Sequence, residues 1–319
     1  MDAESLNALV AARAAQLAYY SPYNFLPQFP GGRQQELFGT GAALGWSHQA
    51  GAEICRSDGY ADADVRWLMQ RLPWDSDYFG TPIFRLFTGL FGVSTTMAEL
   101  THAATALRRQ LEAREGAYYA FGVIPAEDVQ LVQGLSAAGW RVVETRLTYY
   151  RDQLATLDLP RYPVRAAVRA EAAHLGRIVA AARNPYDRVH ADAWFGEHRA
   201  DAYLAQYAVN AVTAGLAATV LVPHADDLPV DSFLAISDLE TDATALGTCL
   251  SRVLLTAVGP ANRGWHVKLL SETLHRARAL SHEAVLMTTQ ATNRAVVRNC
   301  EKLGFRLGAT SLVLACHNG

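Results

Sequence analysis

Residues 284–315 read AVLMTTQATNRAVVRNCEKLGFRLGATSLVLA. The apolar run at 284–290 predicts a strand, and the run at 306–315 predicts a second strand. Between them, residues 293–303 have the pattern of a helix. Gly304 then stands where a helix end requires a positive φ, and the aromatic residue after it returns the chain to a core.

The same pattern occurs in residues 117–150, AYYAFGVIPAEDVQLVQGLSAAGWRVVETRLTYY. A strand at 117–123 leads to a helix over 126–138, and Gly139 precedes a strand over 141–150. A chain of 319 residues is also long enough for about two domains. The repeat therefore indicates two related α/β units.

The composition along the chain, together with the repeat, indicates three parts. Residues 1–60 begin as an Ala/Leu-rich helix and continue rich in Gly, Pro and aromatics. We expect this part to be an irregular extension, either a brace or a substrate lid. We expect a second part over residues 61–155 and a third over residues 164–319, with Pro160 and Pro163 marking a linker between them.

The composition is that of an ordinary folded protein. The chain is 50% hydrophobic and 18% charged, with a formal net charge of −3, and its basic residues occur singly, which argues against nucleic acid as a partner. No apolar run approaches the ~18 residues that span a bilayer, and the first residues lack the pattern of a signal peptide. We therefore expect a cytoplasmic protein with no membrane partner. The four cysteines lack zinc-binding spacing, so no metal site is predicted.

The C-terminal unit alternates predicted strands and helices. Strands are expected near 164, at 219–222, at 232–237 and at 251–258, and helices at 171–182, 196–214 and 267–280. A basic, glycine-containing loop, ANRGWH, joins the last of these strands to the last helix. Loop amides and a helix dipole point to the same place there, and Arg263 adds a charge. This arrangement indicates an anion site, although an ordinary tight turn can have the same sequence.

Two segments together resemble the GCN5-related N-acetyltransferase family. In that family a loop of the form Arg/Gln-x-x-Gly-x-Gly/Ala binds the pyrophosphate of acetyl-CoA. Here Gly264 matches one glycine, while His266 or Lys268 stands at the second small position. The family's Asn-x-x-Ala-x-x-x-Tyr-x-x-x-Gly-Phe segment reads NRAVVRNCEKLGF at 293–305. The resemblance implies a partial N-terminal half-domain and a complete acyl-CoA-binding domain, with a mixed, mostly antiparallel twisted sheet.

Two further segments are similar to the TDP-fucosamine, or amino-sugar, N-acetyltransferase group. LPWDSDYFGTPI at 72–83 is similar to its Trp-Asp-Ser-x-Phe-Phe-Gly segment, and RVHAD at 188–192 to its Arg-Phe-His-x-Asp segment. The substrate-binding residues implied are Trp74, Asp75, Arg188, His190 and Asp192. As residues alone, the first two also fit a scaffold role, and His190 and Asp192 also fit the capping of a helix.

The resemblance also implies acetyl-CoA, or another acyl-CoA, as cosubstrate. In the family a backbone amide of the fourth strand polarises the thioester carbonyl, here near Leu255 or Thr256. The cofactor-binding residues expected on this basis are Leu255, Thr256, Val258, Arg263, Gly264, Trp265, His266, Val267 and Asn293.

Three residues are candidates for proton transfer. The group's proton donor is the tyrosine of the Asn-x-x-Ala segment, and that position is Cys300 here. A thiol with a pKa near 8.5 can protonate a departing thiolate, but cysteine is also a common core residue, so Cys300 is a donor, a packing residue or an acyl carrier. Asp238 and Glu240 follow the third strand as candidate general bases, with a solvated acidic loop as the alternative.

These features predict an acetyl-CoA-dependent N-acetyltransferase that acts on the amine of a small polar acceptor by direct attack on the thioester. The resemblance to the amino-sugar group implies a nucleotide-linked amino sugar as the acceptor. Two alternatives stay open, namely an N-acyltransferase for another natural-product or antibiotic amine, and a non-catalytic protein of the same fold that binds acyl-CoA or a partner. Homodimer formation is compatible with these patterns.

Overall fold

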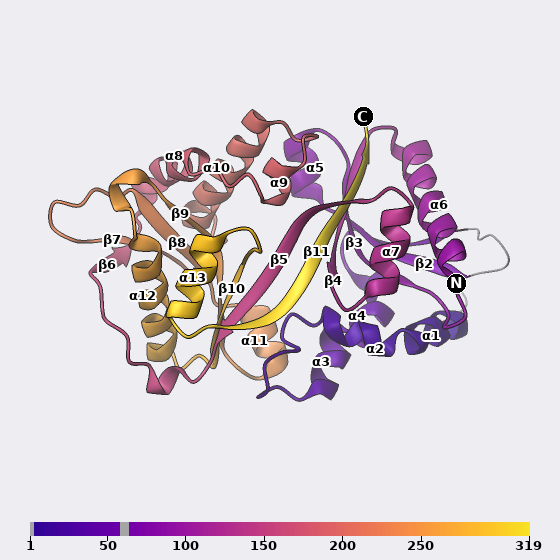
Figure 1. Ribbon diagram of the computed structural model, residues 1–319, viewed down its shortest axis with the longest axis horizontal. Coiled ribbons are helices and arrows are strands. Elements are labelled where there is room, and N and C mark those ends of the chain that lie inside the picture. The colour runs from indigo at the N-terminus through magenta and orange to yellow at the C-terminus, as the bar shows by residue number, and fades with distance from the viewer. Residues whose placement is uncertain (1–2, 58–63) are drawn as a thin grey trace. The chain divides into compact units, whose positions relative to one another are not determined.

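The computed structural model describes residues 3–57 and 64–319. The chain divides into two compact units: unit 1 comprises residues 1–145 and 310–319, and unit 2 comprises residues 146–309. Figure 1 colours the chain from indigo to yellow and labels its elements. Two long strands, β5 (Arg141–Arg151) and β11 (Arg306–Asn318), contribute residues to both units.

Unit 1 begins with short helices and continues as a small sheet with one long helix of 19 residues and two shorter ones. Its elements are α1 (Ala3–Ala12), α2 (Ala14–Leu17), α3 (Gly31–Phe38), α4 (Thr40–Leu44), β1 (Ala52–Ser57), β2 (Val65–Arg71), α5 (Pro73–Phe79), β3 (Ile83–Leu90), α6 (Met97–Glu115), β4 (Tyr118–Pro125) and α7 (Val129–Ala137). The strand order is β1-β2-β3-β4-β11, with β3 and β4 parallel and the other pairs antiparallel.

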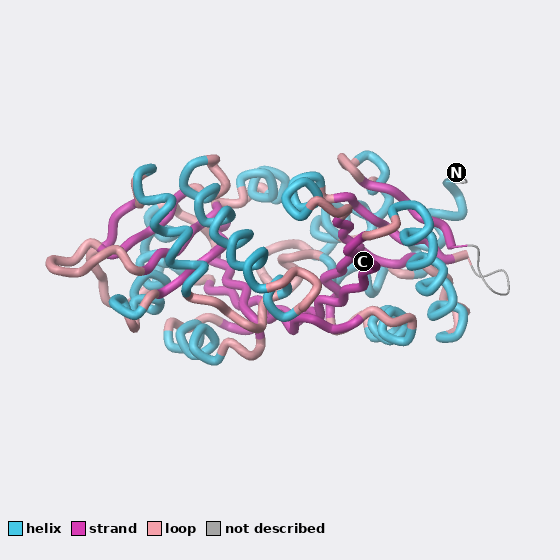
Figure 2. The backbone as a smooth tube through the Cα atoms, turned by 90° about the horizontal axis from the view of Figure 1, so that it is seen from above, coloured by secondary structure: helices cyan, strands magenta, loops and turns pink. Residues whose placement is uncertain are grey.

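Both faces of the unit 1 sheet are covered by helices (Figure 2). Successive strand residues point to opposite faces, so Trp67 and Leu86 pack against α6 and α7, while Leu68 and Phe87 pack against the N-terminal helices. The N-terminal helices therefore form one complete layer of unit 1.

Unit 2 repeats this plan of a sheet with helices on both faces. Its elements are β6 (Val164–Ala166), α8 (Ala172–Ala181), α9 (Arg188–Ala191), α10 (Glu197–Thr213), β7 (Thr219–Pro223), β8 (Ser232–Ser237), α11 (Glu240–Leu246), β9 (Leu250–Val258), α12 (Trp265–Ala279), β10 (Ala284–Gln290) and α13 (Arg294–Lys302). The strand order is β5-β10-β9-β8-β7-β6, and only β9 and β10 pair in parallel.

The two faces of the unit 2 sheet have separate cores. Leu234 and Ile236 face α12 and α13, and the alternating residues Phe233 and Ala235 face α8 and α10. The predicted α/β (α+β) class, with two related units and a mixed, mostly antiparallel sheet, is confirmed. Gly139 and Gly304 also have the predicted positive φ, at +87° and +76°.

One sequence-based expectation was wrong. The stretch from Pro22 to about residue 60 was predicted to be irregular, yet it contains α3, α4 and strand β1. The helices are only eight and five residues long, and Gly39 separates them, so neither shows a full apolar period in the sequence. Strand β1 is recognisable only through its antiparallel pairing with β2.

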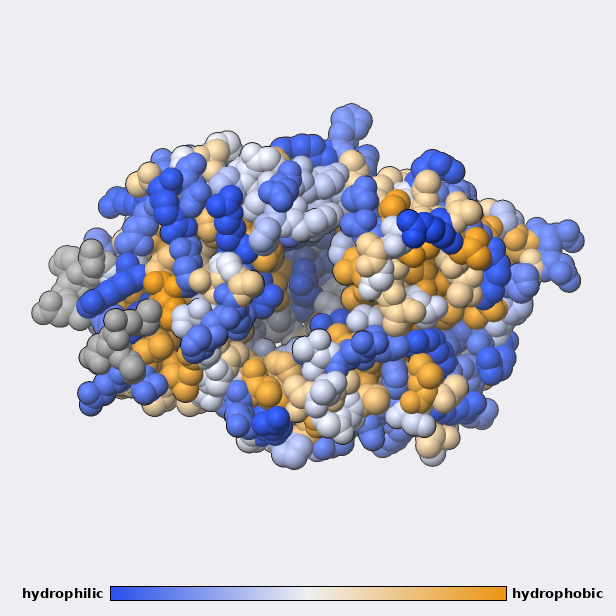
Figure 3. Space-filling model, turned by 180° about the vertical axis from the view of Figure 1, so that it is seen from behind, coloured by the Kyte–Doolittle hydropathy of each residue, from blue (hydrophilic) through white to orange (hydrophobic). Residues whose placement is uncertain are grey.

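In the part of the chain that the structure describes, no helix has both the length and the apolar character needed to cross a membrane. Figure 3 shows hydrophilic and hydrophobic side chains interspersed over the face that it presents.

Candidate functional site

The loop between β9 and α12 is held by hydrogen bonds from side chains. Asn262 is fully buried, and its Oδ1 accepts from the Asp231 amide at 3.0 Å and from the Ser232 hydroxyl at 2.8 Å. Its Nδ2 donates to the Pro229 carbonyl at 3.1 Å. The Asp231 carboxylate in turn accepts from the Ala261 amide at 2.8 Å. These bonds fasten the loop to the start of β8.

The first turn of α12 is open to a ligand. Gly264 precedes the helix with φ +89°, a conformation that favours glycine, and no side chain caps the helix start. The Trp265 side chain points into the core with Leu269 and Leu274, so it does not cover the turn. Helix starts leave backbone N–H groups without intrahelical partners and carry partial positive charge. The uncapped turn, with Arg263 beside it, is suited to an anionic group.

A pocket of about 550 Å³ lies at this turn, entirely within unit 2. Its volume is in the range of small-molecule sites. The walls are supplied by α8, β9, α12, α13, the β9–α12 loop and one residue of the loop before β8. The lining residues are Ile178, Ala181, Ala182, Asp231, Val258, Gly259, Pro260, Arg263, Gly264, His266, Ala295 and Asn299. Apolar side chains predominate, with a few polar groups among them.

His266 is the most perturbed titratable group in the pocket wall. Burial lowers the pKa of its imidazole to about 4, so the ring is neutral at physiological pH. Its Nδ1 lies 2.9 Å from Nδ2 of Asn299, and its Nε2 is buried with no hydrogen-bond partner among the described residues. With the Asn299 amide as donor, Nδ1 accepts and Nε2 carries the proton. The ring then supplies an unsatisfied, uncharged donor.

The strands under the pocket separate from each other. The parallel pairing of β9 with β10 ends at Val253 and Met287, although β9 continues to Val258 and β10 to Gln290. On its other side β9 remains paired with β8, with a register irregularity near Leu254. The separation gives β9 a backbone edge that is not paired with β10 in the described structure, at the level of the pocket.

The predicted cofactor-binding residues fall into two groups. Val258, Arg263, Gly264 and His266 line the pocket. The others have the following places: Trp265 and Val267 pack in or against the core of unit 2, Leu255 packs against the α8–α10 core, Thr256 donates to the Phe233 carbonyl, and Asn293 accepts from the Val296 amide at the start of α13.

The candidate proton-transfer residues lie elsewhere in unit 2. Cys300 of α13 is fully buried in the core of unit 2, and burial raises the pKa of its thiol to about 12. Asp238 forms two hydrogen bonds of 2.7 Å with Arg276. Burial raises the pKa of the Asp238 carboxyl, but the bonds from Arg276 outweigh burial and lower it overall. Glu240 is exposed in the first turn of α11. Their described contacts favour packing for Cys300 and an ion pair for Asp238.

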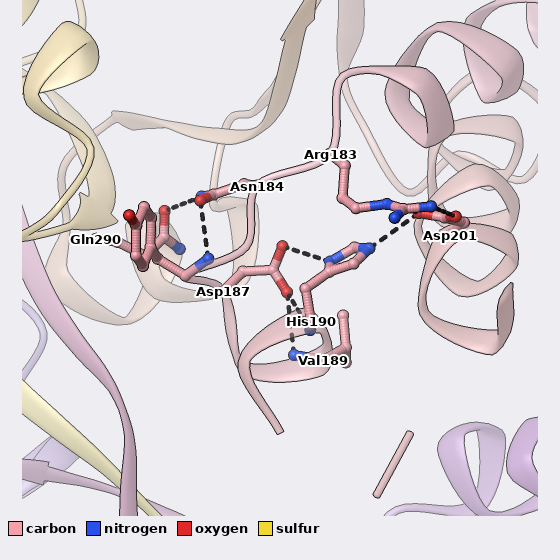
Figure 4. A network of polar contacts seen from close by, with 8 residues as sticks. Arg183, Asn184, Asp187, Val189, His190, Asp201 and Gln290 are labelled. Carbon is pink, nitrogen blue, oxygen red and sulfur yellow. Dashed lines mark hydrogen bonds and ion pairs between the residues drawn. The ribbon is translucent and has the colours of Figure 1, made fainter. Parts of the chain in front are cut away.

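The RVHAD segment belongs to a polar network around α9 (Figure 4). His190 is held between two carboxylates, with Nδ1 2.9 Å from Asp187 and Nε2 3.1 Å from Asp201. Asp187, which caps α9, was not predicted, and Arg183 also binds Asp201. The predicted partners Arg188 and Asp192 lie beside them: Arg188 stacks over Phe195, and the buried Asp192 accepts from the Trp194 amide.

The same network anchors the end of α8 to β10. Asn184 donates to Gln290 at 2.7 Å and accepts from the Tyr186 amide at 3.1 Å (Figure 4). Because Ala181 and Ala182 line the pocket, this anchor fixes one pocket wall.

Trp74 and Asp75 lie in α5 of unit 1. Trp74 stacks on Tyr78 with ring centroids 5.6 Å apart, and 42% of its surface is exposed. Asp75 lies in the first turn of α5.

Sequence reasoning missed several pocket residues. Asp231 lines the pocket, and its carboxylate accepts from the Ala261 amide of the β9–α12 loop. Asn262 lies outside the lining, and its side chain accepts from the Asp231 amide. Asn299 lies inside the quoted 293–305 segment, one position before Cys300, and could have been found there. Nothing in the sequence indicated the α8 residues, because only the fold brings them to the loop.

Comparisons with known proteins gave matches among solved structures only. No family model matches the chain, and no curated protein matches its sequence. A GCN5-related N-acetyltransferase from Sphaerobacter thermophilus matches with a TM-score of 0.54 and 11% identity, over 97% of this chain and 93% of that one. A conserved protein of unknown function from Staphylococcus epidermidis matches with a TM-score of 0.54 and 14% identity, over 82% and 96%.

The fold is that of the GCN5-related N-acetyltransferases. In the terms of this acetyltransferase fold, β9 with its open edge, the following loop and α12 form the frame on which the pocket of unit 2 is built. At such low identity the likeness concerns the fold, and the chemistry of the site has to be argued from its own residues. A tandem acetyltransferase of this type from the clavulanic acid biosynthesis pathway also matches, with a TM-score of 0.45 and 13% identity over 98% and 95%.

Proposed function

We propose that unit 2 binds an acyl-CoA and transfers its acyl group to the amine of a small polar acceptor. The observation that carries this proposal is the pocket of about 550 Å³ at the uncapped start of α12, beside the open edge of β9. A diphosphate needs N–H donors and a cation, which the first turn of α12 and Arg263 supply. A pantetheine arm needs an apolar channel with a few polar contacts, which the remaining lining residues supply.

The polar groups of the pocket fit an uncharged amide of such an arm. The unsatisfied Nε2 of His266 is suited to a carbonyl oxygen, and Asn299 beside it holds the ring. Burying a donor without a partner costs about 1–3 kcal/mol. Nε2 has almost no exposed surface in the structure, so a ligand carbonyl would reach it only if the pocket wall moved, and this contact is part of the proposal.

The chemistry then follows from the open edge of β9. A backbone N–H aimed at the thioester oxygen would stabilise the charge that develops when a neutral amine attacks the carbonyl carbon. The tetrahedral intermediate collapses to an amide and a CoA thiolate, the amine loses a proton and the thiolate gains one. A water can carry these protons. With a pKa of about 4, His266 is better suited to hydrogen bonding than to general-base catalysis.

The acceptor is proposed at the level of an amine. The nucleotide-linked amino sugar rests on the similarity of residues 72–83 and 188–192 to one acetyltransferase group. In unit 2, His190 is already bonded to two carboxylates, which favours a role in shaping the α8–α9 segment over direct sugar binding. An amino-sugar nucleotide therefore belongs in the acceptor screen, beside amino acids and aminoglycoside-type amines.

The test is binding of acetyl-CoA, measured by calorimetry and by thermal stability. A ligand at about 100 times its dissociation constant stabilises the folded state by about 2.7 kcal/mol. We expect a clear upward shift that Arg263→Ala together with Gly264→Val abolishes. Arg71→Ala, which removes an exposed arginine from unit 1, is the matched control and should retain the shift.

Turnover is measured separately, by release of free CoA thiol in the presence of each amine. Binding without turnover on any amine would favour a non-catalytic acyl-CoA-binding protein. Absence of binding with acetyl-CoA and with longer acyl-CoAs would refute the proposal.

A further inference from the structure

Unit 1 has the same strand, loop and helix frame as the pocket of unit 2. Its parallel pair, β3 and β4, separates after Leu86 and Gly122, as β9 and β10 separate after Val253 and Met287. Asp128 follows Gly122 by the same number of residues (122 to 128) as Asn293 follows Met287 (287 to 293), so the two positions correspond. Each directly precedes a helix, α7 in unit 1 and α13 in unit 2.

In unit 1 the N-terminal segment crosses the separated strands. The Tyr20 hydroxyl lies 3.0 Å from the Thr88 hydroxyl of β3 and 2.7 Å from the Asp128 carboxylate at the start of α7. Arg13 forms an ion pair with the same carboxylate, and its guanidinium lies 4.2 Å from the centre of the Phe91 ring. Arg13 and Asp128 are 3% and 1% exposed. Two side chains of the N-terminal segment therefore bridge the two sides of this separation.

The start of the unit 1 helix carries its own anion. Thr96 precedes α6 as Gly264 precedes α12. The Thr96 hydroxyl accepts from the Glu99 amide, and the Glu99 carboxylate accepts from the Thr96 amide at 2.7 Å. This bond lowers the pKa of the Glu99 carboxyl. A carboxylate therefore already lies at the first turn of α6, where α12 has no side-chain cap.

The remaining wall is also closed by side chains. Counted from the last strand pairs, Gln130 of α7 corresponds to Ala295 of α13 (122 to 130 and 287 to 295), and Ala295 lines the unit 2 pocket. Gln130 donates to the Thr95 carbonyl in the loop before α6, at 2.9 Å. Four residues further along α7, Gly134 packs against the side chain of Leu100 in α6.

From these three differences we infer that unit 1 is a second acyl-CoA-type groove that the chain fills with its own side chains, with Arg13 and Tyr20 as its internal occupants. This inference rests on the proposed function of unit 2. It follows that one chain binds one acyl-CoA, in unit 2, although its fold contains the frame for two.

The experiment is calorimetric titration of the full chain with acetyl-CoA. We expect one equivalent per chain, and we expect Gly264→Val to remove all binding. The matched change in unit 1, Thr96→Val with Glu99→Gln, should leave both the stoichiometry and the dissociation constant within about twofold of the parent chain. Two equivalents, or binding that survives Gly264→Val and is lost in the unit 1 variant, would overturn the inference.

Hydrogen exchange locates the bound acetyl-CoA. In the chain without ligand, it tests whether residues 13–20 fill the groove of unit 1. Acetyl-CoA should protect amides in 258–268 and leave those in 86–100 unchanged. In the chain without ligand, amides of 13–20 should exchange as slowly as those of β3, because they are seated against it. Exchange of 13–20 at the rate of an unfolded peptide would overturn the inference that these residues fill the groove of unit 1, even if no acyl-CoA bound. In that case the absence of binding would refute only the proposed function of unit 2.

Discussion

Arg13 and Asp128 form a buried ion pair in unit 1, and removing either partner alone should strongly destabilise this unit. Their side chains are 3% and 1% exposed, so a lone charge left behind would have almost no access to water. Breaking such a pair from one side costs about 3–5 kcal/mol. Asp128→Leu also removes the acceptor of the Tyr20 hydroxyl, which adds about 1 kcal/mol.

The loss cannot be assigned to helix capping. Asp128 stands at the N-cap of α7, but its side chain makes no capping hydrogen bond there. We therefore expect Arg13→Met to lower the free energy of unfolding by about 3–5 kcal/mol and Asp128→Leu by about 4–6 kcal/mol. The double variant should cost less than the sum of the two, with a coupling of about 2–3 kcal/mol, because it leaves no unpaired charge.

Urea denaturation followed by tryptophan fluorescence measures these differences, read from the transition midpoint at an unchanged m-value. Glu36→Ala is the matched control, since it breaks the ion pair of Arg33 and Glu36 in the same unit. Those side chains are 48% and 67% exposed, and such pairs are worth about 0–1 kcal/mol. Single variants at Arg13 and Asp128 that cost no more than this control, or strictly additive losses, would refute the reasoning.

Three further predictions concern unit 2. Because the folded-state pKa of His266 is about 4, below the unfolded value of about 6.5, the unfolded chain binds the proton first, and stability should fall by the order of 3 kcal/mol from pH 6.5 to pH 4. Denaturation across this range should show a flatter profile for His266→Gln; an unchanged profile would contradict it. Gly264→Val, at φ +89°, should cost about 1–2 kcal/mol by thermal unfolding while Gly264→Asn costs less, and equal losses would show that backbone strain is not the cause. Cys300→Ala should lower stability by about 1 kcal/mol but keep the rate of CoA release, whereas loss of transfer in a folded variant would restore Cys300 as proton donor.

The elements that build the pocket could largely be predicted from the sequence, because each has a strong local signal. The apolar runs of β9 and β10, the helical period of α12 and the glycine after α13 are all local patterns, and Arg263 and Gly264 marked the loop that lines the pocket. Pattern and turn chemistry suffice wherever the deciding contacts lie within a few residues.

Long-range contacts could not be predicted in the same way. Asp238 has the sequence context of a solvated acid, and only the fold brings Arg276 to it, 38 positions away. Cys300 has the position of a reactive group in a motif, and its place in the core depends on how α13 packs against α12. The role of His190 depends likewise on Asp201 of α10. Each of these side chains is polar or reactive in sequence and is satisfied or buried by a partner from another element.

The two units of this chain show the same difference between a shared local pattern and the side-chain contacts that other elements add to it. A parallel pair that separates, a loop and a helix start occur in both, so the frame alone does not decide whether a ligand is bound. Unit 2 has glycine before α12 and alanine on α13, which leave donors and volume free. Unit 1 has Thr96 and Gln130 at the corresponding places, and both bond within the chain. If unit 2 binds acyl-CoA as proposed, a few side chains decide whether this frame is a binding site or part of the core, and sequence reasoning about function has to be directed at them.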